Sequence, residues 1–219
     1  MTSDLIYYLF AIFIVFFITN LICNKIYKIN FIKLLIFTIL SIIVGVLMTM
    51  ILYWIENGEF GGISFYGGIF LMPFFSILFG VLSKINMFKL QNLSAFLLMI
   101  TSAIMKYKCF KYDCCKGRKI PIVTEYGYLT FPSQLAEMFF AIFVFIILCF
   151  LFKKNKDRKD LYPMMMVIYG IGRLNLNTFR LYEPVLSFMS WGHIWSIVSI
   201  IIGFVWLFII YKKKRTVLK

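Results

Sequence analysis

Long runs of apolar residues, separated by short polar segments, dominate the chain. A helix needs roughly 20 apolar residues to cross the hydrocarbon core of a bilayer, and seven segments approach or reach this length. They predict an all-α polytopic membrane protein with seven transmembrane helices, at residues 4–24, 32–54, 67–84, 91–106, 133–152, 162–179 and 190–211. We expect a single transmembrane domain over residues 1–219, with an outward loop at 107–132.

The charged residues set the expected orientation of these helices. Most of the 23 Lys and Arg residues fall in the connections on one side of the expected bundle. Cytoplasmic loops of membrane proteins carry such an excess, so we expect the N-terminus outside and the C-terminus inside. With 62 % hydrophobic residues, the chain has no segment for a separate soluble domain. We attribute the net charge of +14 to this topology and to anionic lipid head groups, not to nucleic acid.

The loop after the fourth expected helix is an exception to this charge pattern, because it is basic and lies outside. Its cations are Lys106, Lys108, Lys111, Lys116, Arg118 and Lys119. Two interpretations remain open: a site that handles an anionic head group, or a merely solvated basic loop.

Polar residues within the sixth apolar segment, "YGIGRLNLNTFR", predict an anion site. Arg173 lies twelve residues beyond Leu161, or about 18 Å along a helix. A charge at such depth usually faces a cavity or a partner. Asn177 and Arg180 follow at helical spacing on the same face, and guanidinium groups bind phosphate bidentately. We therefore favour a phosphate clamp over an arginine that reaches back to the outer surface.

A second polar cluster begins the fifth segment, in "FPSQLAE". Pro132 and Ser133 have the character of a helix start, with Ser133 near the free backbone N–H groups. Gln134 and Glu137 then enter the membrane three residues apart on one face. Capping explains Ser133 but not these two residues, so we expect them in the same polar site.

The stretch "GGISFYGG" places Tyr66 between two glycine pairs, Gly61–Gly62 and Gly67–Gly68. Glycines allow a ligand or another backbone to come close, and we expect them to make room for a lipid head group. Close packing of helices through small residues is the alternative. Tyr66 can donate a hydrogen bond, but a phenol with a pKa near 10 is a poor base.

Three cysteines, Cys109, Cys114 and Cys115, fall in the outward loop. A disulfide from Cys109 to one of the other two suits an oxidising compartment. Zinc is less favoured because a fourth ligand is missing, and His193 is far away in the sequence; we expect no metal and no cofactor. His193 opens the last helix, either as a structural hydrogen-bonding residue or as a reserve base.

Taken in order, the motifs resemble those of the bacterial prolipoprotein diacylglyceryl transferases. "FPSQLAE" is similar to the family string His/Tyr-Pro-Ser/Thr-Gln-Leu-Tyr-Glu, and "CFKYDCCKG" is similar to the loop of a divergent branch. "SFYGG", "YGIGRLNLNTFR" and "WGHIWS" complete the resemblance, which runs from about residue 58 to residue 196.

The resemblance implies a transferase in the bacterial cytoplasmic membrane with its active site toward the outer face. Such enzymes move a diacylglyceryl group from phosphatidylglycerol to the thiol of a lipobox cysteine in a prolipoprotein. The implied catalytic residues are Tyr66, Glu137, Arg173, Arg180 and His193. The implied substrate-binding residues are Gly61, Gly62, Gly67, Gly68, Lys106, Ser133, Gln134, Tyr169 and Asn177.

Several positions depart from the family pattern. Tyr66 stands where well-known members have histidine, Lys106 where they have arginine and Cys109 where they have asparagine. Asn92 and Asn177 replace an aspartate and a glutamate that would orient the arginines. These departures leave two alternatives: a non-catalytic membrane protein that binds phosphatidylglycerol or another anionic phospholipid, and a transferase with a different acceptor. A transporter is less favoured because the spacing shows no inverted repeat.

Overall fold

The computed structural model describes residues 10–14, 17, 27–115, 117–124, 127–156, 158–181, 185 and 189–217. The expected first helix, at 4–24, lies largely outside these residues. The elements in chain order are α2 (Phe31–Asn57), α3 (Phe65–Ser83), α4 (Met87–Lys111), β1 (Lys119–Thr124), β2 (Gly127–Thr130), α5 (Ser133–Lys154), α6 (Leu161–Asn177) and α7 (Trp191–Val217).

The long helices identify a multi-pass membrane protein. Within the described part of the chain, α2, α3, α4, α5 and α7 are each long and apolar enough to cross a bilayer. Helix α6 has only 17 residues, and most of them are buried among the other helices. The prediction of a helical polytopic protein is therefore confirmed, whereas the count of seven spans and the orientation of the termini stay predictions.

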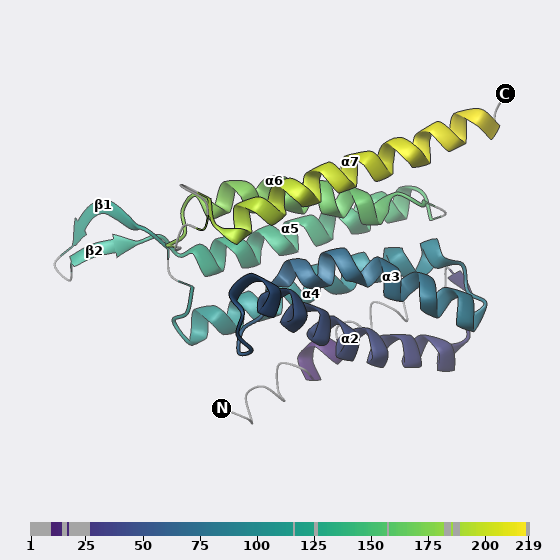
Figure 1. Ribbon diagram of the computed structural model, residues 1–219, viewed down its shortest axis with the longest axis horizontal. Helices are drawn as coiled ribbons and strands as arrows, with labels where there is room; N and C mark the ends of the chain where they lie inside the picture. The colour runs from purple at the N-terminus through teal and green to yellow at the C-terminus, as the bar shows by residue number, and fades with distance from the viewer. Residues whose placement is uncertain are drawn as a thin grey trace.

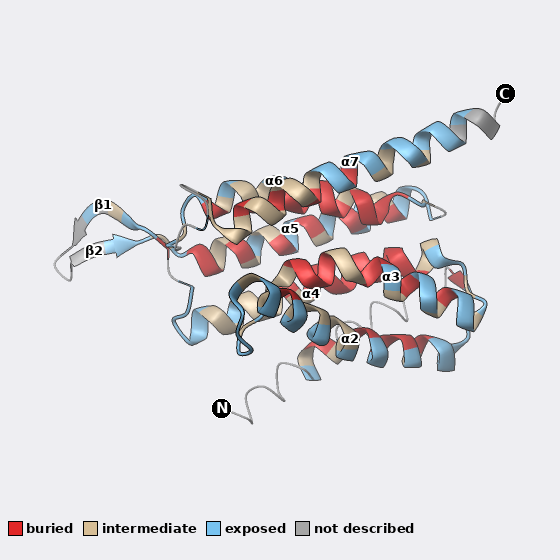
Figure 2. Cartoon of the chain, viewed as in Figure 1, coloured by how far each residue is buried: buried red, intermediate tan, exposed pale blue. Residues whose placement is uncertain are grey.

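The helices form two groups (Figure 1): α2, α3 and α4 lie on one side, and α5, α6 and α7 on the other. Helix α4 joins the groups through contacts with α5 and α6. Its Phe96 ring makes edge contacts with Phe145 and Phe152 of α5. Burial differs among the helices: buried residues concentrate on α4 and α6, whereas much of α7 is exposed (Figure 2). Large apolar side chains such as Phe208 are exposed there, as expected of a surface that faces lipid.

The connection between α4 and α5 differs from the expected loop. Helix α4 runs to Lys111, so the loop starts later than residue 107. At the other end of α4, the side chain of Asn86 caps the helix by accepting a hydrogen bond from Phe88 N. Two strands then pair antiparallel, with Lys119 opposite Thr130 and Thr124 opposite Gly127. The prediction of an all-α protein is wrong here, because a short run of Ile, Val and Thr favours extended structure. The hairpin projects beyond the helix ends (Figure 1).

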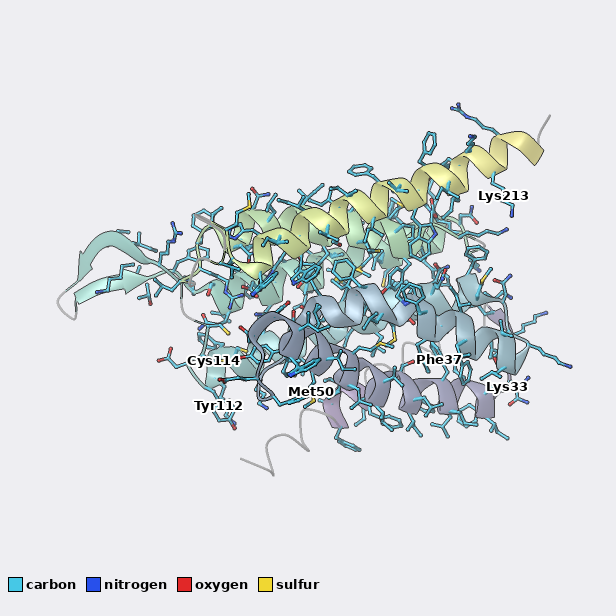
Figure 3. All side chains as sticks on the ribbon, viewed as in Figure 1. Lys33, Phe37, Met50, Tyr112, Cys114 and Lys213 are labelled. Atoms are coloured by element: carbon cyan, nitrogen blue, oxygen red, sulfur yellow. The ribbon has the colours of Figure 1, made fainter. Side chains whose placement is uncertain are left out.

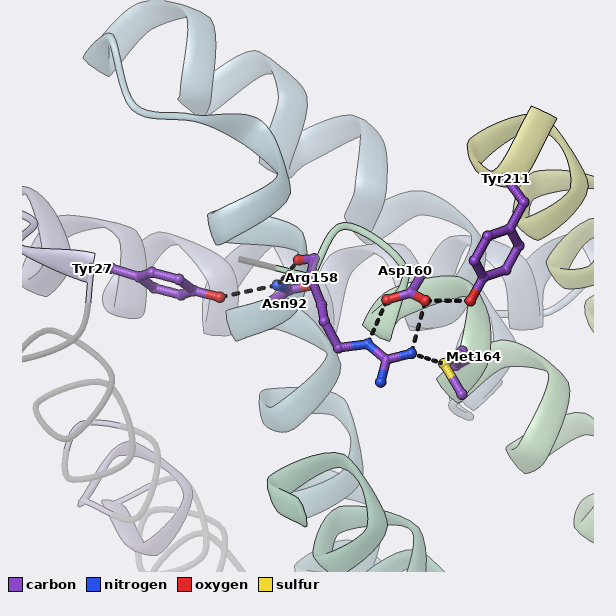
Figure 4. Close-up of polar contacts among 6 residues, drawn as sticks. All are labelled: Tyr27, Asn92, Arg158, Asp160, Met164 and Tyr211. Carbon is purple, nitrogen blue, oxygen red and sulfur yellow. Dashed lines mark hydrogen bonds and ion pairs between the residues drawn. The ribbon is translucent and has the colours of Figure 1, made fainter. Parts of the chain in front are cut away.

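A polar network ties the helices together at the opposite end of the molecule (Figure 4). Arg158 donates from Nε and Nη2 to the Asp160 carboxylate at 2.7 and 2.8 Å, and Tyr211 OH donates to the same carboxylate at 2.7 Å. Burial alone would raise the pKa of Asp160, but these hydrogen bonds lower it. Asn92 Nδ2 donates to Tyr27 OH and to the Arg158 carbonyl at 3.0 and 2.8 Å. The expectation that residue 92 bears on the arginines of α6 is therefore wrong.

Candidate functional site

Glu137 is the centre of a buried cluster of charges. Lys106 Nζ lies 2.6 Å from Glu137 Oε2, Arg173 Nη1 forms an ion pair with the same oxygen, and Arg180 Nε lies 3.5 Å from Oε1. The sequence placed these four residues in one site, and the structure brings them together. Three cations around one carboxylate leave two positive charges uncompensated within the cluster.

Three helix ends position this cluster. Lys106 lies near the end of α4, Glu137 in the first turns of α5, and Arg173 in the second half of α6. Arg180 lies beyond α6, which ends at Asn177. All four therefore gather where α4 and α6 end and α5 begins. Figure 3 shows Tyr112 and Cys114 at this end of the molecule, and Lys33 and Lys213 at the other.

Burial within the cluster is graded. The side chain of Glu137 is 4 % exposed and that of Arg173 10 %, whereas Lys106 and Arg180 are 15 % and 21 % exposed. The countercharge is thus the deepest group, and the excess positive charge is nearest to solvent. An anion that enters from the side of Arg180 and Lys106 meets cations first.

Arg180 lies beyond the end of α6, and the segment before β1 holds it in position. Arg118 N donates to the Phe179 carbonyl at 2.8 Å, and Gly117 forms a β-bridge with Arg180. Arg118 Nε also donates to the Arg180 carbonyl at 3.3 Å, and the rings of Phe131 and Phe179 lie 4.9 Å apart. Helical spacing predicted Arg180 on the same face as Arg173, but it gave no sign of these backbone contacts.

Tyr66 is buried and its hydroxyl is engaged. Tyr66 OH lies 2.6 Å from Ser196 Oγ, and Ser196 Oγ donates to the Gly192 carbonyl at 2.6 Å. A serine hydroxyl has a single proton, so Tyr66 must be the donor in the first bond. The ring contacts Tyr169 edge-on at a centroid distance of 6.1 Å. The expected donor is therefore present, but its proton already has an acceptor.

The glycines around Tyr66 serve helix packing. A Cβ atom at Gly67 would overlap the Met48 carbonyl of α2, and one at Gly62 would overlap the ring of Tyr53. At Gly68 a Cβ atom would lie 3.1 Å from Leu98 Cδ2 of α4. Gly61 has a positive φ of 154° in the connection between α2 and α3. The expected space for a lipid head group is thus wrong at Gly62 and Gly67, where the packing alternative holds.

Ser133 and Gln134 hold the cysteine-containing loop. Ser133 Oγ donates to the Cys115 carbonyl at 2.7 Å, and Gln134 Nε2 donates to the Cys114 carbonyl at 2.6 Å. Helix α5 begins at Ser133 itself, with Pro132 at the N-cap position and no side-chain cap, so the expected cap is not formed. Their one-turn spacing from Glu137 nevertheless ties this loop directly to the charge cluster.

The cysteines that the structure describes, Cys109, Cys114, Cys115 and Cys149, are free thiols. The expected disulfide from Cys109 is therefore absent among them. The sulfur atoms of Cys109, Cys114 and Cys115 all lie within 4.8 Å of one another. A hydrogen bond with Cys109 lowers the pKa of Cys115 to about 5, against the effect of burial, and the positive charges of Lys106 and Arg180 act in the same direction.

Three further expected site residues lie around the cluster. Asn177 is buried against Gly192, and its Nδ2 has no hydrogen-bond partner among the described residues. Tyr169 is buried between aromatic rings, including Phe140 at 6.2 Å. His193 Nδ1 accepts a hydrogen bond from the Ser190 backbone N–H at 3.3 Å. This contact matches the structural role, one of the two alternatives that the sequence left open for His193.

The fold and the site together define a multi-pass membrane protein with a buried cationic centre at one end of its helices. The sequence profile of the prolipoprotein diacylglyceryl transferase family matches residues 5–209, and the chain belongs to this family. A phosphatidylglycerol–prolipoprotein diacylglyceryl transferase of Proteus mirabilis (strain HI4320) is 34 % identical over 101 residues. That match covers 44 % of this chain and 34 % of the relative, so the chain spans about a third of the length of the curated relative it matches.

Proposed function

We propose that the chain transfers a diacylglyceryl group from phosphatidylglycerol to the thiol of a lipobox cysteine in a prolipoprotein. The name of the Proteus relative states its lipid and its acceptor class. The proposal includes a site toward the outer face of the bacterial cytoplasmic membrane. In support, Lys33 and Lys213 lie at the end opposite to the cluster, as the positive-inside rule requires for that orientation.

One observation carries the proposal: Lys106, Arg173 and Arg180 surround a single carboxylate, that of Glu137, and leave an excess of two positive charges. A phosphodiester carries one negative charge, and the glycerol phosphate that leaves it can carry two. The site therefore matches the leaving group better than the intact lipid. Binding that strengthens as the reaction proceeds is the condition for rate acceleration.

The residues then have separate roles in this reaction. The thiolate sulfur attacks the glycerol carbon of the diacylglyceryl group, a C–S bond forms, and the C–O bond to phosphate breaks. The electron pair of that bond remains on the phosphate oxygen, where Lys106 and Arg180 meet it from the more exposed side. Arg173 binds from the buried side, and Glu137 keeps the three cations in place. Asn177, one helical turn from Arg173, offers a buried Nδ2 donor that has no partner among the described residues.

The test is a transfer assay with purified protein in nanodiscs of phosphatidylglycerol. A lipobox peptide should gain the mass of one diacylglyceryl group on its cysteine, and the same peptide with serine at that position should gain none. The proposed reaction would be overturned if wild-type protein bound the lipid but left the cysteine peptide unmodified in every assay.

A non-catalytic lipid-binding role is the second candidate. It is favoured by the hydrogen bond from Tyr66 to Ser196, because a phenol that already donates to a serine is a poor proton acceptor for a thiol. This role predicts saturable binding of phosphatidylglycerol that is lost in Arg173→Ala, with no peptide product at any lipid concentration. A transferase with a different acceptor would instead release glycerol phosphate without modifying the lipobox peptide.

A further inference from the structure

The proposed reaction leaves the cysteines at the end of α4 without a role. Cys109 lies in the last turn of the helix, and Cys114 N donates to the Cys109 carbonyl at 3.0 Å, which folds the loop back over the helix end. Asp113 and Cys115 have φ values of 53° and 58°, a conformation that is uncommon for residues other than glycine. This tight turn brings the three sulfur atoms within 4.8 Å of one another.

Hydrogen bonds from α5 hold the cysteine-containing loop in this arrangement. Ser133 donates to the Cys115 carbonyl and Gln134 to the Cys114 carbonyl, both from the first turn of α5. Hydrogen bonds to the ligand-bearing segment orient ligands in metal sites in the same way. Two polar side chains that are almost fully buried thus support the loop.

The sulfur set matches the chemistry of zinc. Thiolate ligands favour Zn²⁺, and Zn–S bonds of about 2.3 Å place the sulfurs of a tetrahedral site roughly 3.8 Å apart. The three thiols therefore need only small side-chain rotations to bind one ion. Three protein ligands leave one coordination position open, which is the arrangement of catalytic zinc sites.

We propose that Cys109, Cys114 and Cys115 bind one Zn²⁺ ion, and that its open position takes the acceptor thiol. The second half of this inference rests on the proposed transferase function, whereas the first does not. The site would supply a means to deprotonate the acceptor thiol. Of the two residues expected as bases, Tyr66 donates its proton to Ser196, and His193 Nδ1 already accepts from a backbone N–H.

The chemical step balances with zinc as the only added component. The acceptor thiol loses its proton to solvent water when it binds the ion, since a coordinating thiol is deprotonated. The bound sulfur then attacks the glycerol carbon, the C–O bond breaks, and the electron pair leaves with the phosphate. The charge cluster lies next to the ion, because Lys106 precedes Cys109 by one turn and Arg180 bridges Gly117. The product is a neutral thioether, a weaker ligand than a thiolate, and it dissociates.

Metal binding is measured without reference to turnover. Full-length protein is purified in detergent under reducing conditions, stripped with a chelator and titrated with Zn²⁺, and then with Co²⁺ as a spectroscopic probe. We expect one ion per chain and a thiolate-to-cobalt charge-transfer band. Cys109→Ser, Cys114→Ser and Cys115→Ser should each weaken Zn²⁺ binding at least 100-fold. Cys149→Ser is the matched control, because Cys149 is free and exposed on α5, and it should bind like wild type.

Two results would overturn the metal site: stoichiometric binding that survives in the three variants, or a disulfide between Cys109 and either neighbour in protein isolated anaerobically without metal. Circular dichroism of each variant shows that a loss of binding is not a loss of fold.

The acceptor position is tested by adding lipobox peptides to the Co²⁺ protein. A cysteine peptide should change the absorption spectrum, and the serine peptide should not. Metal binding without any response to the cysteine peptide would overturn the acceptor role alone. A spectral response without any lipid transfer would instead contradict the proposed transferase function and leave the proposed metal site unaffected.

Discussion

Arg173 of α6 and Glu137 of α5 form an ion pair in the interior of a membrane protein, where their side chains are 10 % and 4 % exposed. Removal of one partner from a buried pair leaves an uncompensated charge. Glu137 also pairs with Lys106 and Arg180, so this carboxylate is the group on which the assembly of the site depends.

Glu137→Gln should destabilise the protein by about 3–5 kcal/mol, because three cations would lose the countercharge that they share. Thermal unfolding in detergent measures the effect. Glu59→Gln is the matched control, since Glu59 lies exposed in the connection between α2 and α3. Phosphatidylglycerol should restore part of the lost stability, because its phosphate can replace the carboxylate. An unchanged unfolding temperature would contradict the central position of Glu137.

Arg173→Ala should lower the rate of transfer by about 10²–10³, the usual loss when one preorganised group that stabilises developing charge is removed. Arg173→Lys should recover little of this loss, because an ammonium group lacks the planar fork of a guanidinium. Transfer to the lipobox peptide is the measurement, and Lys213→Ala, at the far end of the molecule, is the control. A fully active Arg173→Ala variant would be inconsistent with a phosphate-binding role.

Tyr66→Phe should cost about 1 kcal/mol of stability through the loss of one buried hydrogen bond. Ser196→Ala should cost more, because it also removes the hydrogen bond from Ser196 Oγ to the Gly192 carbonyl. The double variant should cost less than the sum, because both changes remove the same bond. Unfolding of the four proteins measures this coupling. If Tyr66→Phe abolished transfer while Ser196→Ala left it intact, the phenol would have a chemical role beyond this bond.

The network around Asp160 should make stability depend on pH. Hydrogen bonds from Arg158 and Tyr211 outweigh burial and lower the pKa of Asp160. A carboxyl with a lowered pKa in the folded state contributes stability above its unfolded value of about 4, and this contribution is lost as pH falls below that value. Wild type should therefore exceed Asp160→Asn in unfolding temperature at pH 7, and the difference should shrink below about pH 4. A constant difference across this range would refute the assignment.

Gly67→Ala should destabilise the protein more than Gly68→Ala. A Cβ atom at Gly67 would overlap backbone atoms of Met48 and Thr49, which cannot move without separating α2 from α3. The atom at Gly68 would meet the end of a flexible Leu98 side chain at 3.1 Å. Thermal unfolding of the two variants measures the difference between a backbone contact at Gly67 and a side-chain contact at Gly68. Equal losses of stability would show that α2 and α3 are not tightly packed at Gly67.

The sequence predicted the charge cluster because ionic groups within apolar segments must find partners, and few were available. It missed the partners of Ser133 and Gln134, since these side chains bind backbone carbonyls, which every residue has. Asn92 was misplaced for a different reason: only the family resemblance linked it to the arginines, whereas its side chain binds Tyr27 and the Arg158 carbonyl. The hairpin was hidden because β1 and β2 are too short for a clear alternation of apolar and polar positions.

Because α6 ends at Asn177, the position of Arg180 depends on the segment before β1 and not on a membrane-embedded helix. One of the three cations is thus held through the connection between α4 and α5 and not by the apolar helices. A side chain at Gly117 would act on this charge directly, because its Cβ atom would overlap the Phe131 carbonyl and displace the segment that bridges Arg180. The geometry of the cation cluster therefore depends on the connection between α4 and α5 as well as on the helices.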